Sequence, residues 1–498
     1  MFPTSASTRV YQVAQIRALE QQLLAQSTTP AALMQAAARA CLAVLQKRWP
    51  LQRTITVMAG TGNNAGDGYW LAVYAKEAGW NVRIFTSDMD RTLSEPIKEA
   101  VNAASQLGIN RQRWTPASEL RGVVVDALLG IGLRGALSAS VLNMIEAINR
   151  SDLPVLSIDV PSGLCADRGA ISEASVQADV TVTFIGHKLG LLTGAGPVKA
   201  GTVYLDDLGC EDLIEDLPQT ASLLQAHNLP SLPPRNLSSH KGQYGHCLVM
   251  GGDHGYGGAA ILASQAALRG GAGRVTLVTR TEHVAPLLAR QPEVMALGVD
   301  SSYRLPPLLE QADALVLGPG LGQAPWGSTL LSLAQTQSMP QVWDADALNL
   351  LAAGEHQISP NAPVILTPHP GEAARLLGLS VSAVEQNRYE AAQNIAKRWN
   401  AVVVLKGRGS LIVAPDGRLA ICGEGHPAMA SAGLGDVLAG WLGALLCQGL
   451  STWDAARLGV WLHARAGVIE GQKGRGLAAA DLIPSMRALL EEHSPCLN

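Results

Sequence analysis

Apolar runs of strand length alternate with helical patterns through the first part of the chain. Two helical segments are expected first, near residues 8–26 and 30–48. The runs that follow are TITVMAG, NVRIFT, GVVVDALLG, PVLSIDVPSG, ADVTVTFIG and GTVYLDD, and helical stretches such as SASVLNMIEAINR separate the first four. Short β-branched runs that alternate with helices indicate a mainly parallel sheet covered on both faces. The pattern predicts a Rossmann-like, three-layer α/β domain.

A second alternation of strands and helices begins after a segment of different composition. That segment is acidic in DDLGCEDLIEDLP and rich in Pro, Ser and Asn in NLPSLPPRNLSSHKG. The later strand-length runs are GHCLVMGGD, RVTLVTR, ALVLGPGLG, QVWDADALN, PVILTPHPGE, AVVVLKGRGS and RLAICGEG. A chain of 498 residues is too long to fold around a single ordinary hydrophobic core. We therefore predict two domains, 1–212 and 221–498, with a linker at 213–220.

Composition and charge exclude several classes of protein. Apolar residues make up 47% of the chain and charged residues 16%, so long disordered tracts are not expected. A net charge of −4 without a long basic run argues against a nucleic-acid partner. The seven cysteines form no CxxC pair, which suits a reducing compartment. We expect a cytoplasmic homo-oligomer. No secretory signal is expected, because the start, MFPTSASTRV, has no charged n-region followed by an apolar core. No membrane partner is expected, because the apolar stretch VLAGWLGALLCQGL is too short to span a bilayer.

Three polar loops that contain glycine follow strands of the first predicted sheet. They are GTGNNAGDG (60–68), DALLGIGLRGA (126–136) and DVPSG (159–163). The carboxyl ends of parallel strands share one edge, where ligands bind. Glycine N–H groups suit an anion, and amide, carboxylate and hydroxyl oxygens suit a cation. Each loop alone is also compatible with an ordinary Asx-capped turn. The usual G-x-G-x-x-G spacing fails, because Ala65 stands where the third glycine is required.

Two turns of the second domain carry candidate chemistry. KGRGS (406–410) offers a lysine and glycine N–H groups, and SAGLGDVLAG (431–440) places glycines at a helix start with Asp436 on the first turn. Such a helix start suits a phosphate in transfer, and an adjacent aspartate can accept a hydroxyl proton. The alternative for Asp436 is simple complementarity to the helix dipole. The sequence contains no G-x-x-x-x-G-K-[ST] motif, which excludes a P-loop.

The motifs together resemble one family. GTGNNAGDG, DALLGIGLRG, DVPSGL and FIGHKLG are similar to the epimerase domain of the NAD(P)H-hydrate repair enzymes. GGDHGYGGAAILAS, GPGLG, DADAL, LTPHPGE, LKGRGS and AGLGDVLAG resemble the ribokinase-like dehydratase domain of the fused bacterial enzyme. The resemblance implies that the first domain interconverts the R and S hydrates of NADH and NADPH (NADHX and NADPHX). It implies that the second domain phosphorylates the S hydroxyl with ADP and eliminates phosphate, which restores NAD(P)H.

The resemblance also implies site residues. In the epimerase domain, the hydrate would contact Asn63, Asn64, Ala65, Gly66, Asp67, Gly130, Ile131, Gly132, Leu133, Arg134, Gly135, Ala136 and Asp159. Potassium would bind Asn64, Asp126 and Ser162, and Asp159 and Lys188 are the acid–base candidates. In the dehydratase domain, the hydrate would contact Ala259, Gly320, Gly322, His369 and Asp436, with Asp436 as the base. ADP with Mg²⁺ would contact Lys406, Gly407, Arg408, Gly409, Ser410 and Gly435.

Some alternatives stay open at this point. Ala65 departs from the family's usual NNGGD loop and would be strained at a positive φ, and Cys165 replaces the usual Asp of PSGLDAD. Lys188 is alternatively a solvated surface charge, and His369, between two prolines, is alternatively part of a rigid turn. The rival function is a ribokinase-type small-molecule kinase fused to a nucleotide-binding scaffold domain. MASAGLGD lacks the Asp-Thr lead of such kinases, which favours the dehydratase.

Overall fold

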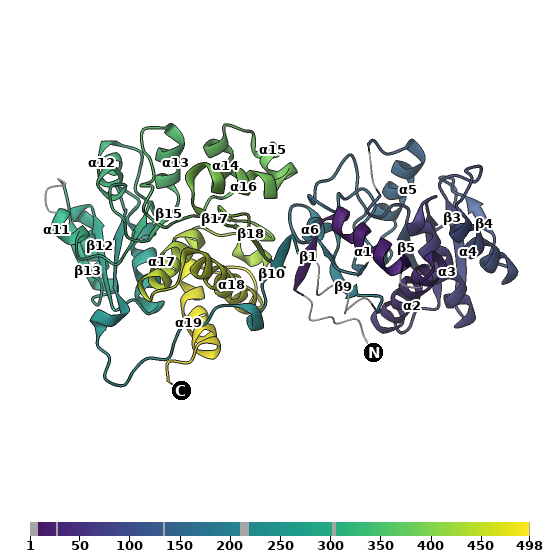
Figure 1. Cartoon of the computed structure of the whole chain (residues 1–498), viewed down its shortest axis with the longest axis horizontal. Coiled ribbons are helices and arrows are strands. Elements are labelled where there is room, and N and C mark those ends of the chain that lie inside the picture. Colours follow the sequence, from purple (N-terminus) through teal and green to yellow (C-terminus); the bar gives the residue numbers. More distant parts are fainter. Residues whose placement is uncertain (1–7, 26–27, 133–134, 210–218, 301–304, 498) are drawn as a thin grey trace. The chain divides into compact units, whose positions relative to one another are not determined.

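The chain folds into two compact α/β units (Figure 1). The computed structural model describes residues 8–25, 28–132, 135–209, 219–300 and 305–497. Unit 1 is Met1–Ser222 and unit 2 is Leu223–Asn498. The predicted α/β class is therefore confirmed. Of the predicted linker, residues 213–218 lie outside the described residues, so its limits stay a prediction.

Unit 1 is built on a parallel sheet of seven strands in the order β4-β3-β2-β5-β6-β7-β9. The strands are β2 (Thr54–Ala59), β3 (Asn81–Thr86), β4 (Arg111–Arg113), β5 (Val123–Ala127), β6 (Val155–Ile158), β7 (Val180–Phe184) and β9 (Thr202–Asp206). The strand order reverses between β2 and β5, so the loops after these two strands leave the sheet side by side. Such a switch point is where doubly wound sheets bind ligands.

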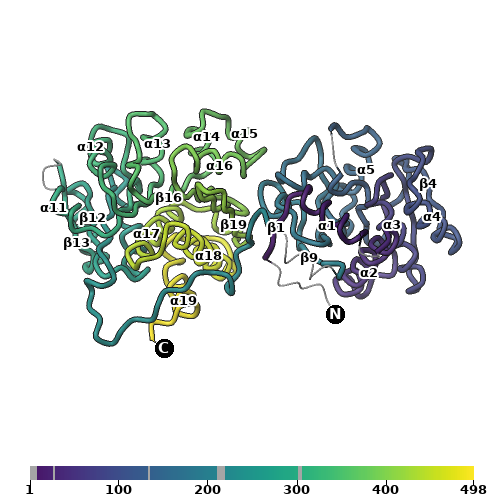
Figure 2. Tube along the Cα trace, viewed as in Figure 1, coloured from purple at the N-terminus to yellow at the C-terminus, as the bar shows by residue number. Residues whose placement is uncertain are grey.

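Helices cover both faces of this sheet, as the two-residue period of the strands requires. They are α1 (Val13–Ala25), α2 (Pro30–Arg48), α3 (Asn63–Glu77), α4 (Glu95–Gln106), α5 (Ala139–Arg150), α6 (Leu189–Leu192) and α7 (Gly196–Lys199). Ile55 and Val57 pack in one core with α1 to α4, whereas Met58 and Val124 pack in another core with α5. Alternate residues of single strands thus anchor the two helical layers. The helices around this sheet can be followed in Figure 1 and Figure 2.

The first expected helix begins later than the sequence pattern indicates. Residues Arg9–Tyr11 form a short strand, β1, and α1 begins only at Val13. Val10 and Tyr11 are fully buried. They pair in parallel with β8 (His187–Lys188) and antiparallel with the start of β10 (Ala221–Leu223). Pairing partners distant in sequence therefore override the local helical pattern, and they fix the backbone that carries Lys188.

Unit 2 contains a sheet in the order β13-β12-β11-β14-β15-β16-β17-β18-β19. The strands are β11 (His246–Met250), β12 (Arg274–Thr279), β13 (Met295–Gly298), β14 (Ala314–Leu317), β15 (Gln341–Trp343), β16 (Val364–Leu366), β17 (Val402–Leu405), β18 (Ser410–Val413) and β19 (Leu419–Cys422). Pairing is parallel from β13 to β17 and antiparallel for β18 and β19. The loops after β11, β14, β15, β16 and β17 therefore leave from the same edge.

Eleven helices pack on the described part of this sheet. They are α9 (Gly257–Arg269), α10 (Val284–Arg290), α11 (Pro306–Leu309), α12 (Pro325–Ala334), α13 (Asp346–Ala353), α14 (Pro370–Leu377), α15 (Val381–Gln386), α16 (Arg388–Trp399), α17 (Leu434–Cys447), α18 (Thr452–Gly471) and α19 (Leu482–His493). The apolar helix α17 is buried along its length. It approaches α9 so closely that a Cβ on Gly440 would lie 1.9 Å from the Ala263 carbonyl oxygen. Only glycine permits this approach, which seats the start of α17 at the sheet edge.

Among the described residues, no single helix is long and apolar enough to cross a membrane. Helices α1 and α2 reach that length and composition only as a pair bent by 117°.

Candidate active sites

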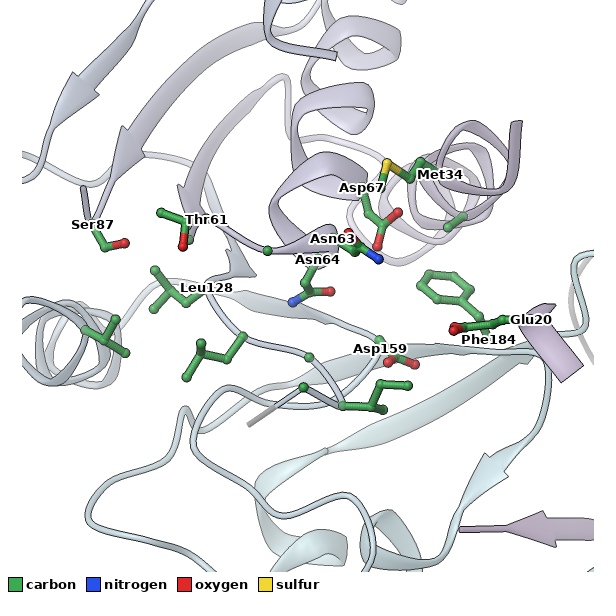
Figure 3. Close-up of a pocket in the computed structure, with 18 of the residues that line it drawn as sticks. Glu20, Met34, Thr61, Asn63, Asn64, Asp67, Ser87, Leu128, Asp159 and Phe184 are labelled. Atoms are coloured by element: carbon green, nitrogen blue, oxygen red, sulfur yellow. The ribbon is translucent and has the colours of Figure 1, made fainter. Parts of the chain in front are cut away.

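A cavity of about 820 Å³ opens at the switch point of the unit 1 sheet (Figure 3). The lining residues that the sequence predicted are Asn63, Asn64, Asp67, Gly130, Ile131, Gly132, Ala136, Asp159 and Lys188. Ala65 and Gly66 are instead buried in α3, and Gly135 is not among the lining residues. Leu133 and Arg134 lie outside the described residues. Ala65 is not among the residues with positive φ, so its replacement of glycine carries no backbone strain.

Asn64 presents an unpaired amide at this cavity. Its side chain is buried, with 7% of the residue exposed. Neither its oxygen nor its nitrogen has a hydrogen-bond partner within the described residues. A Cβ on Gly130 would contact the Asn64 side chain at 3.4 Å, so the amide lies against the loop after β5. A buried polar group without a partner is costly, which indicates a place for a ligand or an ion.

Asp126 is the centre of a buried hydrogen-bond network behind the same loop. One carboxylate oxygen accepts bonds from the Ser162 hydroxyl at 2.5 Å and the Leu128 N–H at 3.3 Å. The other accepts from the Ser157 hydroxyl and the Ser162 N–H, each at 2.8 Å. Burial raises the pKa of Asp126, against the hydrogen bonds from Ser162 and Ser157. Asp126 and Ser162 are thus brought together as predicted, although neither lines the cavity itself.

Asp159 and Lys188 form a buried ion pair on another wall of the cavity. The Lys188 ammonium lies 2.5 Å from the Asp159 carboxylate and also donates to the Thr183 hydroxyl at 2.9 Å and the Phe184 carbonyl at 2.7 Å. Only 1% of Lys188 is exposed, so the interpretation of Lys188 as a solvated charge is wrong. Asp159 has a φ of 66°, in the left-handed region that disfavours side chains, a strain typical of functional positions.

Two further charged groups of this cavity were missed by the sequence reasoning. Glu20 and Arg17 of α1 both line it, yet nothing in the α1 sequence distinguishes them from a solvated face. Burial raises the pKa of Glu20, and Asp159 adds to that shift against Lys188 and Arg17. Burial also raises the pKa of Asp67 well above its usual range, with Asp159 and then Glu20 as further causes. Only the packing of α1 against the sheet brings these groups together.

Unit 2 gathers a second set of charged groups at the edge where its parallel strands end. The Lys406 ammonium lies 2.6 Å from the Asp344 carboxylate and 3.9 Å from that of Glu372. The Thr367 hydroxyl also donates to Asp344, at 2.7 Å. A Cβ on Gly435 would lie 3.3 Å from the Lys406 nitrogen, so the start of α17 adjoins this pair. Burial lowers the pKa of Lys406, but Asp344 and Glu372 outweigh it and the net shift is upward.

Asp436 lies on the first turn of α17, within the electrostatic reach of this cluster. Burial raises its pKa to about 7, with a further contribution from Asp344 and an opposing one from Lys406. The pKa of Glu372 is also raised, first by burial. A carboxyl group with a pKa near the working pH suits general base catalysis. Complementarity to the helix dipole alone does not explain this environment, because the dipole favours the ionised form.

The other predicted residues of unit 2 surround the same edge. Gly320 lies against Tyr256 and Ala259, and Gly322 against Asp253. His369 caps α14: its ring accepts the Gly371 N–H at 2.9 Å, and its backbone N–H donates to Glu372 at 2.7 Å. His369 is therefore part of a rigid turn, and its half-exposed side chain, 50% accessible, leaves it open to a ligand. Burial lowers its pKa, with Lys406 as the next cause.

The loop from Lys406 to Ser410 is held from behind by an arginine that the sequence did not single out. Arg388, of which 2% is exposed, donates to the carbonyls of Leu405 and Lys406 at 3.2 and 3.0 Å. Gly407 has a φ of 138°, and a Cβ there would lie 3.0 Å from the guanidinium. Only glycine fits this turn. The loop is thus preorganised, with Arg388 as its support.

The motif DADAL (344–348) contributes two aspartates for which the sequence predicted no role. Asp344 pairs with Lys406, and Asp346 accepts the Gly322 N–H at 2.9 Å. Ala345, between them, has a φ of 48° and a ψ of −115°, which is strained for any residue with a Cβ. The strained residue turns the two aspartates toward different loops. The sequence did contain a signal for this role, because both aspartates come directly after a predicted strand, at the edge where ligands bind.

The fold and the two lysine–carboxylate sites define a two-unit α/β enzyme whose second unit is ribokinase-like. Residues 247–486 match the family model described as NAD(P)H-hydrate dehydratase, and residues 30–190 match that of the YjeF-related protein N-terminus. The bifunctional NAD(P)H-hydrate repair enzyme Nnr of Coxiella burnetii is 41% identical over 408 residues, 81% of this chain and 83% of that protein. The Escherichia coli enzyme of that name is 41% identical over 392 residues, 77% and 74% of the two chains.

A solved structure agrees with the assignment of unit 2. A ribokinase-like superfamily protein from Enterococcus faecalis is 27% identical, with a TM-score of 0.52 over 56% of this chain and 98% of that one. The chain belongs to the family of bifunctional NAD(P)H-hydrate repair enzymes. The predicted family, the bifunctional epimerase and dehydratase class and the ribokinase-like second fold are thereby confirmed, which disfavours the small-molecule kinase.

Proposed function

We propose that the cavity of unit 1 epimerises the R and S hydrates of NADH and NADPH, and that the edge of unit 2 dehydrates the S form with ADP and Mg²⁺. The observation that carries this assignment is the separation of two acid–base centres. Asp159, ion-paired with Lys188, lies in one unit, and Asp436, beside Lys406, lies in the other. Self-association and a cytoplasmic location stay predictions.

In unit 2, Asp436 is the base that takes the proton of the S hydroxyl as that oxygen receives a phosphoryl group from the nucleotide. The start of α17 and the glycine N–H groups after Lys406 fit a phosphate, because unpaired N–H groups and the helix dipole both favour an anion. Lys406 can donate a further hydrogen bond to such an anion, because its three N–H donors have only two carboxylate neighbours and 22% of its side chain is exposed. Gly320, Gly322 and His369 surround the hydrate in this proposal.

In unit 1, we assign a potassium ion to the region of Asn64, Asp126 and Ser162. The donors are all oxygens, which suit an alkali cation, and the unpaired Asn64 amide provides one that no described protein group satisfies. The Ser162 hydroxyl contacts Asp126 and both the N–H and the carbonyl of Leu129. A cation here would keep the loop from Leu128 to Gly132 ordered around the hydrate.

Replacing Asn64 by alanine in the full chain tests the cation without disturbing the Asp126 network. Wild-type epimerisation is expected to rise at least about tenfold when potassium replaces lithium, and Asn64→Ala to lose that response. Dehydration of the S hydrate with ADP and Mg²⁺ is measured in the same samples and remains unchanged. Asn110→Ala, at an exposed position outside the cavity, is the matched control. Equal rates in the two cations would remove potassium from the proposal.

Expressing residues 221–498 alone tests the division of labour. Because this fragment holds the whole charged cluster of unit 2, it should dehydrate the S hydrate and leave the R hydrate untouched. Chromatography of R and S hydrates, with and without ADP, measures both. A folded fragment that cannot dehydrate the S form would show that unit 1 contributes to the second site.

A further inference from the structure

Three carboxyl groups that line the unit 1 cavity lie within electrostatic reach of the Lys188 ammonium. Asp159 is paired with Lys188, whose three donor contacts are already made. Asp67 and Glu20 also line the cavity, and neither has an ion-pair partner among the described residues. Figure 3 shows Asp67 on α3 and Asp159 on the loop below it, so the two carboxyl groups enter the cavity from different walls. Asp67 has no side-chain hydrogen bond in the described part of the chain.

The charges around Asp67 favour its protonated form. Glu20 and Arg17 line the same cavity from α1, Asp159 from the loop after β6 and Lys188 from β8, and the buried Cys41 thiol lies on α2. Two of the neighbours are carboxylates, and the Lys188 ammonium is committed to Asp159. Burial is the first cause that raises the pKa of Asp67, and the charge of Asp159 is the second. Asp159, in contrast to Asp67, has an ion-pair partner, the Lys188 ammonium at 2.5 Å.

We propose that Asp67 is the second acid–base residue of the epimerase, acting on the opposite face of the hydrate ring from Asp159. The proposal rests on epimerisation by unit 1 and adds a group that donates the proton where Asp159 accepts one. The buried, unpaired Asn64 amide lies on the same helix one turn away and marks this part of the cavity as ligand-binding. Two carboxyl groups in unlike environments divide acid and base roles in the same way at other enzyme sites.

The chemistry balances without any co-reactant. Water adds to the ring enamine at the carbon bonded to nitrogen, so that carbon carries the hydroxyl. Asp67 gives its proton to this hydroxyl, the C–O bond breaks with its electron pair leaving in water, and the nitrogen lone pair forms a planar C=N bond. Water then attacks the other face, a new C–O bond forms, the C=N pair returns to nitrogen, and Asp159 takes the proton. When Asp159 carries the proton and Asp67 the negative charge, the same steps run in the reverse direction, as an epimerase requires.

Oxygen labelling of the full-length enzyme tests this route. In water enriched in ¹⁸O, wild-type enzyme should place the label in the hydroxyl at the rate of epimerisation, beyond the enzyme-free rate. Asp67→Asn should lower both rates about 100-fold or more, whereas Asp67→Glu should keep at least about a tenth of the activity. Wild-type epimerisation should also fall as rising pH removes the proton of Asp67, and the residual activity of Asp67→Asn should lack that fall.

Glu146 of α5 provides the matched control, because it is exposed, pairs with Arg150 and lies outside the cavity. Glu146→Gln changes the same kind of group in the same unit and should stay within about threefold of wild type. Calorimetry of each full-length variant reports whether unit 1 is folded, because dehydration of the S hydrate belongs to unit 2. Asp67→Asn that epimerises within about threefold of wild type would overturn the proposal, as would deuterium entering at the hydroxyl-bearing carbon without ¹⁸O exchange. A wild-type chain that dehydrates but never epimerises would instead overturn the function of unit 1.

Discussion

Both units place a lysine beside an aspartate at the carboxyl ends of parallel strands, but the two lysines are held differently. Lys188 donates to three protein acceptors and is 1% exposed. Lys406 donates to Asp344, has Glu372 at 3.9 Å, and is 22% exposed. An ammonium with all three protons committed fixes its partner in place. An ammonium that keeps an N–H donor without a protein acceptor, at an exposed edge, can bind a phosphate. The comparison separates a positioning lysine from a ligand-binding one.

The two sites also share backbone strain next to the ion pair. Asp159 has a φ of 66° in unit 1, and Ala345, directly after Asp344, has a φ of 48° in unit 2. Each such conformation costs about 1–3 kcal/mol and persists only because the surrounding structure imposes it. Unit 1 strains the functional carboxylate itself. Unit 2 strains a small residue between two aspartates, which makes this strain accessible to mutation without loss of a charged group.

The largest effect that would sharpen the comparison is expected at Asp436. Asp436→Asn is nearly isosteric, so it should keep the fold while nucleotide-dependent repair of the S hydrate falls at least about 100-fold. Epimerisation, which belongs to unit 1, should not change. Asp416→Asn is the matched control, because Asp416 is exposed and pairs with nearby Arg418, which is also exposed. Near-normal turnover by the Asp436→Asn variant would remove this carboxylate from the mechanism.

A smaller effect is expected from pH. Burial raises the pKa of Asp436 to about 7, so the base is protonated below that pH and ionised above it. Dehydration kcat/KM should therefore rise about tenfold between about pH 6 and pH 8. Asp344→Asn should shift the midpoint of this profile to lower pH. The variant removes the Asp344 charge, which after burial is the largest cause that raises the pKa of Asp436, and it leaves the Lys406 ammonium without its ion-pair partner, so that Lys406 stabilises the charged form of Asp436. A profile that is flat over this range contradicts the assigned base.

The Asp436 carboxyl group should also lower the free energy of unfolding of unit 2 as the pH rises. Its folded pKa lies above its ordinary unfolded value, so the favourable contribution is complete below about pH 4 and is lost as the pH rises through about 7. Asp436→Asn removes this titration and should raise the melting temperature of unit 2 by a few degrees at about pH 8, on the order of 1–4 kcal/mol. At about pH 5 the gain should shrink to about a third, and it should vanish only below about pH 4. Calorimetry at the two pH values measures it, and a gain that does not depend on pH argues for another cause.

The smallest effect is expected from relief of strain at Ala345. Ala345→Gly should stabilise unit 2 by about 1 kcal/mol, since strain of about 1–3 kcal/mol outweighs the entropy cost of glycine, about 0.5–1 kcal/mol. Dehydration should fall several-fold, because Asp344 and Asp346 are then held less rigidly. Ala488→Gly, at an exposed position inside helix α19, should instead destabilise by about 1 kcal/mol. Denaturant unfolding compares them, and the same sign for both variants would exclude strain as the cause.

The sequence by itself determined the parts of the molecule that depend on local pattern. Apolar period-2 runs such as TITVMA became buried strands, and the glycine-rich turns became loops at the ligand-binding edge. The family followed from motifs in which residue type and spacing are both constrained. Asn64, Asp126 and Ser162 were named from such motifs, and Asp126 and Ser162 do meet in the structure.

Tertiary structure alone decided which charges face one another. Glu20 reaches the cavity on a helix whose sequence shows only amphipathic packing, and Arg388 supports the Lys406 loop from a distant helix. Val10 and Tyr11 became a strand because β8 and β10 offered partners, against the local helical pattern. Protonation of Asp67 and Asp436 depends on burial and on neighbours far away in sequence. Desolvation and Coulomb interactions act through space, so a linear pattern does not contain them.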